Sequence, residues 1–313
     1  MSMAFYDNSK DERAAIVARI SEEILNELQT NTSLKISAYF ADEDTYIRKA
    51  AYLSAGKIYD AEKGIRKALL NVLEQLLHSP DFKIRQTVIN AAGEIGKKDF
   101  EVVKDFFDKG LFDDHHSPRN AVIGSIKKMG ELNPGPVIDW ARHYLHHEDK
   151  EIRREICHGI ELRGRKYPQD ILPLLEELQH DKTARVRNTL VHVIGQIAYK
   201  KGCLETVIQH LNHWDNKALV AAAIEEIIDV HYRYRNFSFY TQDEAEQYIR
   251  LIAAHLGKFG LKLDAAGGHG NFIRVLGPFA GEDQRTREAS IVLQLLQKEK
   301  VRVSSIAGLG NLC

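Results

Sequence analysis

The sequence is poor in cysteine, in long apolar runs and in net charge, and each shortage excludes a class of protein. Only three cysteines occur among 313 residues, and their odd number and spacing favour reduced thiols over a disulfide framework or a zinc site. No run of 18 apolar residues is present, and the first residues lack the apolar segment of a secretion signal. We therefore expect a cytoplasmic protein that has no membrane span.

The near balance of charge bears on possible partners. Lys and Arg number 43, whereas Asp and Glu number 44, so the formal net charge at pH 7 is −1. A protein that binds duplex DNA through its phosphates normally has a basic excess, because each neutralised phosphate needs a Lys or Arg. Any basic surface of this chain must therefore be local.

The sequence does contain a short pattern that recurs at a nearly constant interval. A polar capping residue, an apolar residue and then Arg appear in DTYIRKA, DFKIRQT, HHSPRNA, DKEIRRE and ARVRNTL. The arginines, here called the marker arginines, are separated by 37, 34, 34 and 34 positions and are Arg48, Arg85, Arg119, Arg153 and Arg187. A period in this range is typical of stacked supersecondary units.

Each unit has the pattern of two helices. In the fifth unit, apolar residues recur at helical spacing at Val186, Leu190, Ile194 and Ile197, which indicates a helix with one buried face. Such a pair cannot bury its apolar faces alone, so each hairpin must pack on the next. The predicted fold class is therefore all-α, an α-solenoid of stacked HEAT-like helical hairpins (an α–α superhelix) with a concave wall.

The pattern divides the chain into three parts. We expect an N-terminal capping helix in residues 1–30, about six hairpins in residues 31–232, and a divergent C-terminal helical cap in residues 233–313. The first helix of each hairpin should begin near Ser33, Glu62, Asp99, Pro134, Pro168 and Leu204. The second helix should begin near Asp44, Asp81, His115, Asp149, Lys182 and Asp215. Asp44, Asp81 and Asp149 can cap their helices through the side chain.

If the second helices line the concave wall, residues one repeat apart form rows across it. The first row, one residue after each marker arginine, contains Lys49, Gln86, Asn120, Arg154 and Asn188. The row one turn further along contains Leu53, Asn90, Gly124, His158, His192 and Glu226, and the next contains Lys57, Glu94, Lys128, Leu162, Gln196 and Val230. The mixed charges favour hydrogen bonding to a partner over bulk neutralisation of phosphates.

Three groups of residues along these helices could have a more specific role. His158, His192 and Glu226 resemble metal ligands, but neighbouring helices lie about 8–10 Å apart and zinc ligands must approach to about 2 Å, so we predict no metal site. The marker arginines are expected to pair with an Asp of an adjacent turn. A basic cluster that could hold a phosphate, or else form a solvated helix end, consists of Arg153, Arg154, Arg163, Arg165 and Lys166.

A further segment, HYRYRNFSFY from His231 to Tyr240, alternates aromatic and basic residues. Aromatic rings that stack on bases and cations that bind the backbone are the chemistry of single-strand binding. The alternative is structural, with Tyr232, Phe237 and Phe239 closing the open end of the solenoid. The sequence leaves both interpretations open.

The stretch from Trp140 to Trp214 resembles the HEAT-like-repeat DNA alkylation repair glycosylases of the AlkC and AlkD type, most closely the AlkC branch. The likeness covers about 75 of the 313 residues and is carried by the Arg153–Arg154 pair, the segment RGRKYP and the helices ILPLLEELQ and ARVRNTLVHVIGQIA. The resemblance implies excision of positively charged alkylpurines from duplex DNA without metal or cofactor. That chemistry needs a carboxylate facing the deoxyribose and aromatic rings around the base.

The catalytic carboxylates of that family do not carry over. In our alignment the family's Glu falls on His158 and its Asp on Gln196, while the aromatic end of its Arg-Pro-Arg-Leu-Pro-Trp segment leaves only Tyr167. We therefore predict a monomeric, non-catalytic HEAT-repeat scaffold that needs no cofactor and binds a protein or nucleic acid on its concave face. The expected binding residues are Arg153, Arg154, His158, Arg163, Arg165, Lys166, Asn188, His192 and Gln196.

The alternative is an active alkylpurine DNA glycosylase. It would use a carboxylate at another position, for which the candidates are Glu155, Glu161 and Glu226. The sequence favours a protein that is not an enzyme without excluding this activity.

Overall fold

The computed structural model describes residues 4–256, with side chains to residue 252. Every regular element in this part of the chain is a helix, in agreement with the predicted all-α class. The helices are η1 (Phe5–Asp7), α1 (Lys10–Thr30), α2 (Leu34–Ala41), α3 (Thr45–Ala61), η2 (Lys63–Ile65), α4 (Arg66–Leu77), α5 (Phe82–Gly96), α6 (Lys104–Gly110), α7 (His116–Leu132), α8 (Pro134–Tyr144), α9 (Lys150–Gly159), α10 (Glu161–Gly164), α11 (Pro168–Glu176), α12 (Ala184–Ala198), α13 (Leu204–Leu211), α14 (Lys217–Arg233) and α15 (Gln242–Leu256). Most of the predicted C-terminal helical cap, from residue 257 onward, lies outside the described residues.

The chain divides into two compact units, residues 1–162 (unit 1) and residues 163–313 (unit 2). Unit 1 contains α1 to α9, and unit 2 contains α11 to α15, with the single turn of α10 at the boundary. Most helix starts agree with the predicted hairpins, but α4 begins at Arg66 and α6 at Lys104, a turn or more after the predicted Glu62 and Asp99. The division into residues 1–30, 31–232 and 233–313 stays a prediction.

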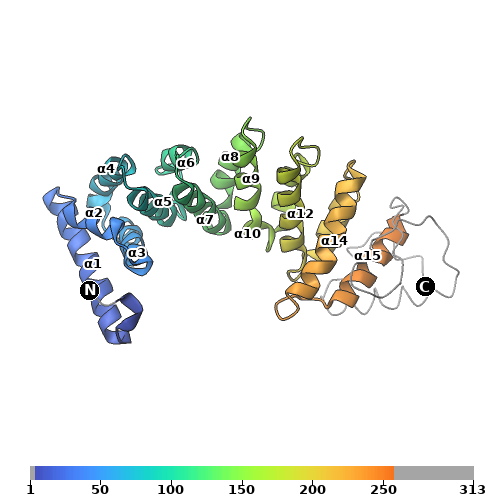
Figure 1. The fold of residues 1–313 in the computed structure, drawn as a ribbon, viewed down its shortest axis with the longest axis horizontal. Coiled ribbons are helices and arrows are strands. Elements are labelled where there is room, and N and C mark those ends of the chain that lie inside the picture. The colour runs from blue at the N-terminus through green and yellow to red at the C-terminus, as the bar shows by residue number, and fades with distance from the viewer. Residues whose placement is uncertain (1–3, 257–313) are drawn as a thin grey trace. The chain divides into compact units, whose positions relative to one another are not determined.

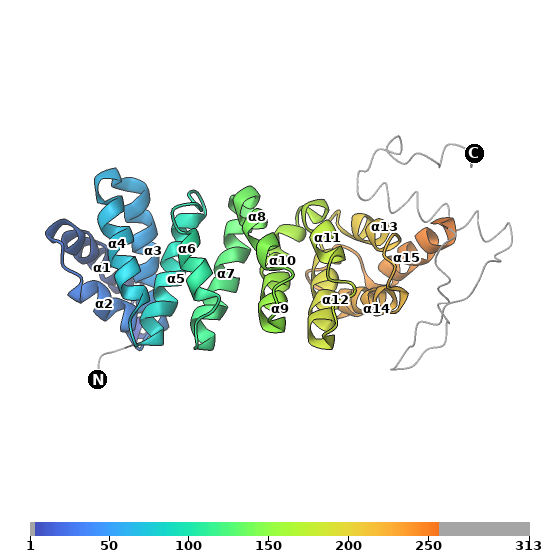
Figure 2. The same ribbon diagram turned by 90° about the horizontal axis from the view of Figure 1, so that it is seen from above.

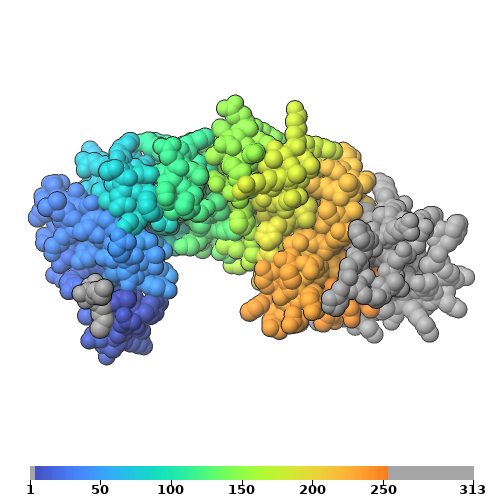
Figure 3. Space-filling model, in the orientation of Figure 1, coloured from blue at the N-terminus to red at the C-terminus, as the bar shows by residue number. Residues whose placement is uncertain are grey.

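Unit 1 is a stack of helical hairpins. Its second helices α3, α5, α7 and α9 pack side by side in chain order, and α1 packs against α3 at the N-terminal end. We call these four helices the second-helix layer. Helices α4, α6 and α8 lie along one side of this layer and form a second layer (Figure 1). The hairpins follow one another along the unit (Figure 2). In the space-filling view the atoms of successive helices in unit 1 form one continuous body (Figure 3).

The hairpins are held together by the apolar faces that the sequence predicts. Leu69 and Leu73 of α4, Val88 of α5 and Phe107 of α6 are all fully buried, and each such side chain contributes about 1.5–3 kcal/mol on burial. The aromatic rings of Phe107 and Phe100 stack with centroids 5.8 Å apart. The core of unit 1 therefore lies between its two layers of helices.

Adjacent second helices approach closely at one position of the repeat, eight residues after the marker arginine. A Cβ atom added to Gly93 of α5 would lie 2.4 Å from Ser125 Oγ of α7, and one added to Gly195 of α12 would lie 2.6 Å from Glu226 Cγ of α14. Both glycines thus remove a steric block between neighbouring helices. Lys127 occupies this position in α7, and α7 packs less extensively on α9 than on α5.

Unit 2 is also built from packed helical hairpins. Its helices α12 and α14 pack side by side, α13 packs on α11 and α12, and α15 packs on α13 and α14. Leu190 and Ile194 of the predicted stripe are fully buried, as is Trp214. At the C-terminal end, the rings of Tyr240 and Tyr248 stack with centroids 6.3 Å apart. Part of the HYRYRNFSFY segment therefore does close the end of the described stack.

Candidate binding surface

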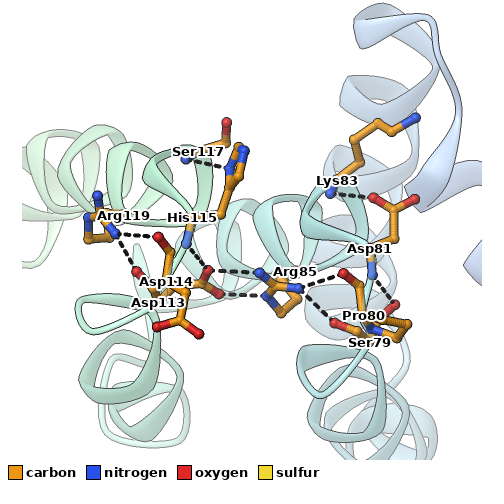
Figure 4. Close-up of polar contacts among 10 residues, drawn as sticks. All are labelled: Ser79, Pro80, Asp81, Lys83, Arg85, Asp113, Asp114, His115, Ser117 and Arg119. Carbon is orange, nitrogen blue, oxygen red and sulfur yellow. Dashed lines mark hydrogen bonds and ion pairs between the residues drawn. The ribbon is translucent and has the colours of Figure 1, made fainter.

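The marker arginines have the same structural role in each of the five repeats that carry one. Each donates hydrogen bonds from Nη1 to carbonyl oxygens of the loop that precedes its own helix, which fixes the loop against the first helical turn. The acceptors are Asp42 and Glu43 for Arg48, Ser79 and Pro80 for Arg85, Asp113 and Asp114 for Arg119, His147 and Glu148 for Arg153, and Asp181 for Arg187. Figure 4 shows this arrangement for Arg85 and Arg119.

The same loops cap the four helices of the second-helix layer through a side chain. Asp81 Oδ1 accepts a hydrogen bond from the amide of Lys83 at 2.8 Å, and His115 Nδ1 accepts one from the amide of Ser117 at 3.1 Å (Figure 4). These bonds satisfy amides that the helix itself leaves without acceptors. The structure confirms the three predicted caps Asp44, Asp81 and Asp149. Caps and marker arginines together fix how each second helix enters the layer.

Arg85 also joins consecutive hairpins through an Asp. Arg85 Nε lies 2.6 Å from Asp113 Oδ2, and Arg85 Nη2 lies 2.9 Å from Asp113 Oδ1 (Figure 4). Burial opposes ionisation of Asp113, but the hydrogen bonds from Arg85 and the His115 amide outweigh it, so the pKa of Asp113 lies below its usual value. The predicted pairing with an Asp of the adjacent turn is confirmed at Arg85, whereas carbonyl oxygens of its own loop are the acceptors common to all five arginines.

The exposed face of the second-helix layer in unit 1 carries the predicted rows. Lys49 and Lys57 of α3 are exposed, and so is Lys128 of α7. Glu94 of α5 is the acid among them: it forms ion pairs with Lys97 and, at 3.9 Å, with Lys128. Uncharged polar residues of the same rows lie between these charges and are Gln86, Asn90 and Asn120. These rows are therefore polar, and lysines outnumber acids in them.

On the first two turns of α9, the predicted binding residue Arg154 forms ion pairs with two carboxylates. Its Nε lies 2.9 Å from Glu151 Oε2, and its Nη2 lies 3.5 Å from Glu155 Oε1. Glu155 is buried, its Oε2 has no hydrogen-bond partner in the structure, and Arg119 Nε of α7 lies 3.9 Å from its Oε1. Burial raises the pKa of Glu155, and the two arginines only partly oppose this.

His158 takes part in a second polar cluster of unit 1. Its Nε2 lies 3.1 Å from Glu161 Oε2, and Lys127 Nζ of α7 lies 2.9 Å from His158 Nε2 and 3.1 Å from Glu161 Oε2. Sequence reasoning missed Lys127. The available signal was that a lysine stands at the repeat position that Gly93 and Gly195 occupy elsewhere.

The predicted basic cluster is shared between the two units, because Arg153 and Arg154 belong to unit 1 and Arg163, Arg165 and Lys166 to unit 2. Its prediction as a phosphate site stays a prediction.

Within unit 2, the predicted arginines contact different groups. Arg163 forms an ion pair with Asp170, with Nη2–Oδ2 at 2.6 Å, and its guanidinium lies 3.9 Å from the ring centroid of Tyr167. Arg165 Nη2 donates to Oε1 of the buried Gln196 at 2.8 Å. Two predicted binding residues, Arg165 and Gln196, are thus hydrogen-bonded to each other. Asn188 is exposed near the start of α12, and Lys166 is exposed in the turn before α11.

In unit 2, His192 and Glu226 of the second predicted row belong to a chain of ion pairs. Glu226 Oε1 lies 3.5 Å from His192 Nδ1 and 2.5 Å from Arg233 Nη2, and Arg233 Nε lies 2.5 Å from Asp229 Oδ2. Burial raises the pKa of Glu226, but the hydrogen bonds from His192 and Arg233 outweigh it, so the pKa is lowered. Glu226 is therefore an ionised carboxylate held between two side chains.

Comparison with known proteins agrees with the repeat architecture. A family model of HEAT repeats matches residues 35–127, a segment that extends from α2 into α7. No curated protein matches the chain. No helix within residues 4–256 is both long enough and apolar enough to cross a membrane.

Several solved structures are similar at low identity. The N-terminal domain of MAST/Orbit is 17% identical with a TM-score of 0.45, and the match covers 63% of this chain and 97% of that one. A chain of the Kap95p–RanGDP structure is 13% identical with a TM-score of 0.40, covering 97% of this chain and 40% of that one. A chain of the CpcE–CpcF complex of phycocyanin lyase from Nostoc sp. PCC7120 is 16% identical with a TM-score of 0.30, covering 85% and 95%. The repeat character of the chain rests on the family match and on the hairpins themselves.

Proposed function

We propose that this chain is a non-catalytic repeat scaffold that binds a protein partner on the exposed face of the second-helix layer of unit 1. The observation that carries the proposal is the set of polar side chains that the repeat places on that face. Lys49, Gln86 and Asn120 occupy equivalent positions on three neighbouring helices, and their loops are fixed by the marker arginines. A rigid stack that presents polar groups at regular intervals is suited to an extended partner segment.

The charges on this face favour an acidic partner segment. Lys97 and Lys128 form ion pairs with Glu94, and the exposed Lys49 and Lys57 lie on the neighbouring helix α3, so a partner that supplies carboxylates is electrostatically complementary. A duplex would need a denser array of cations along its phosphates, whereas here the uncharged Gln86, Asn90 and Asn120 separate the lysines. These features support a protein partner over a duplex.

Charge reversal tests this proposal. The double variant Lys49→Glu/Lys128→Glu should weaken recovery of the partner from extracts of the source organism and make the remaining binding less sensitive to salt. The matched control is Lys67→Glu/Lys104→Glu, which reverses two exposed lysines on α4 and α6. Equal loss with both double variants, or no loss with the first, would contradict the assignment of this face.

An alkylpurine DNA glycosylase is the second candidate, supported by Glu155. Its unpartnered Oε2 lies in a buried position close to two arginines. However, burial raises the pKa of Glu155, and this works against the ionised carboxylate that a cationic sugar requires. Release of N-methylated purines from duplex DNA at enzyme-like rates, lost in Glu155→Gln, would establish this activity and overturn the first proposal.

A further inference from the structure

Two turns lie side by side at one end of the hairpins of unit 2. The turn between α12 and α13 begins at Tyr199, and the connection between α14 and α15 contains Phe239. The amide of Phe239 donates to the carbonyl oxygen of Tyr199 at 3.1 Å. The rings of Tyr199 and Tyr234 stack with centroids 5.3 Å apart and planes inclined by 14°. These contacts hold the two turns together as one surface.

The HYRYRNFSFY segment contributes two kinds of aromatic residue to this region. Tyr240 is 5% exposed and stacks on Tyr248, as expected of a residue that closes the end of a stack. Tyr232 is 56% exposed and Phe237 is 74% exposed. Closing the stack therefore does not account for Tyr232, at the end of α14, or for Phe237, in the connection that follows, whose rings remain accessible.

Cations lie beside the rings of both turns. Lys200 Nζ lies 4.4 Å from the ring centroid of Tyr199, Lys201 Nζ lies 5.4 Å from that of Phe239, and the Arg235 guanidinium lies 5.3 Å from that of Tyr232. Within residues 4–252, no carboxylate forms an ion pair with Lys200, Lys201 or Arg235. Arg233 is different, because Glu226 and Asp229 neutralise it. The surface thus combines accessible rings with three cations that form no ion pair with the described residues.

We propose that these two turns form a binding site for single-stranded nucleic acid. Bases stack on the exposed rings of Tyr232 and Phe237, and the phosphates between them contact Lys200, Lys201 and Arg235. A duplex keeps its bases stacked on one another and cannot offer their faces to these rings. An acidic peptide would engage the cations but would leave the rings unused. The site lies in unit 2 and is independent of the proposed protein-binding face of unit 1.

The test uses full-length protein and fluorescence anisotropy with a labelled oligothymidine and a labelled oligouridine of about 15 nucleotides. We expect binding of both, with an affinity that falls as salt rises from about 50 to 200 mM. Tyr232→Ala/Phe237→Ala should weaken binding about tenfold or more, and Tyr232→Trp/Phe237→Trp should retain it. Lys201→Ala/Arg235→Ala should weaken binding and make its salt dependence shallower.

Matched controls separate the site from general effects. Phe112→Ala removes an aromatic ring of unit 1 that is 51% exposed, and Lys182→Ala removes an exposed lysine of unit 2; both variants should bind as the wild type does. Circular dichroism of each variant establishes that it is folded. The proposal is overturned if the oligonucleotides do not bind, or if the folded alanine variant of Tyr232 and Phe237 binds as tightly as the wild type. It is also overturned if polyglutamate displaces the oligonucleotide equally well from the wild type and from that variant.

Discussion

Arg85 of α5 and Asp113 of the loop before α7 form a two-point ion pair that joins consecutive hairpins of unit 1, with N–O distances of 2.6 and 2.9 Å. The same guanidinium binds two carbonyl oxygens of its own loop. One side chain therefore fixes both the entry of its own helix and the position of the next hairpin. A comparison with a marker arginine that lacks this ion pair therefore measures what the link between hairpins adds to stability.

Replacing Arg85 by Ala should destabilise unit 1 more than replacing Arg48 by Ala. Both variants lose the bonds to loop carbonyls, but only Arg85→Ala also leaves the largely buried Asp113 without its cation. We expect an additional loss of about 1–3 kcal/mol in the free energy of unfolding. Urea denaturation followed by circular dichroism measures this difference. Equal losses in the two variants would show that the pair with Asp113 adds nothing.

The close approach of second helices can be tested at a glycine. Gly93→Ala would place Cβ 2.4 Å from Ser125 Oγ, so we expect it to lower stability by about 1–3 kcal/mol through overpacking. The control is Gly124→Ala in α7, where an added Cβ meets no atom within 4 Å. That variant should be neutral or stabilising by up to about 1 kcal/mol, because alanine favours a helix. If Gly93→Ala is tolerated as well as the control, the two helices are not held at the proposed distance.

His231 should make the stability of unit 2 depend on pH. The side chain is fully buried, and burial lowers its pKa, although its hydrogen bond with the carbonyl oxygen of Ile227 partly opposes this. Below about pH 6.5 this imidazole is protonated in the unfolded chain but stays neutral in the folded one, because its folded pKa is lower. The free energy of unfolding therefore decreases as pH falls from that value towards the folded pKa. His231→Phe should remove this component.

Trp214 reports on this effect, since it is fully buried in unit 2. In a Trp140→Phe background it is the only tryptophan of the chain. Urea midpoints from its fluorescence should decrease between about pH 7.5 and 5.5, and less so after His231→Phe. The exposed His180→Gln serves as the control and should keep the wild-type decrease. An unchanged pH dependence in His231→Phe would exclude His231 as the cause.

Much of the fold could be predicted from local sequence, since its determinants are local. The marker arginines and the caps Asp44, Asp81 and Asp149 act within a few residues of their own positions, so their spacing located the hairpins. The last predicted hairpin shows the limit of such signals: its marker position holds Ala221, and its helix, predicted to begin near Asp215, is capped by Asn216.

The candidate surface was less predictable because it depends on contacts between residues far apart in the sequence. The rows of exposed polar residues followed from the repeat, but the bond between Arg165 and Gln196 and the ion pairs of Glu226 did not. The link between Lys127, His158 and Glu161 likewise depends on helix packing. The HYRYRNFSFY segment had two competing interpretations. The sequence does not show that Tyr240 is buried whereas Tyr232 and Phe237 are exposed.

The most direct measurement of the central claim is site-specific photo-cross-linking in the source organism. A photoreactive residue is placed either at Asn120 on the second-helix layer or at Asn71 on α4, two exposed asparagines of unit 1. We predict a discrete, protease-sensitive and nuclease-resistant adduct from position 120 that is lost in the Lys49→Glu/Lys128→Glu variant, and no such adduct from position 71. An adduct from position 71 alone, or a nuclease-sensitive adduct from position 120, would contradict the account.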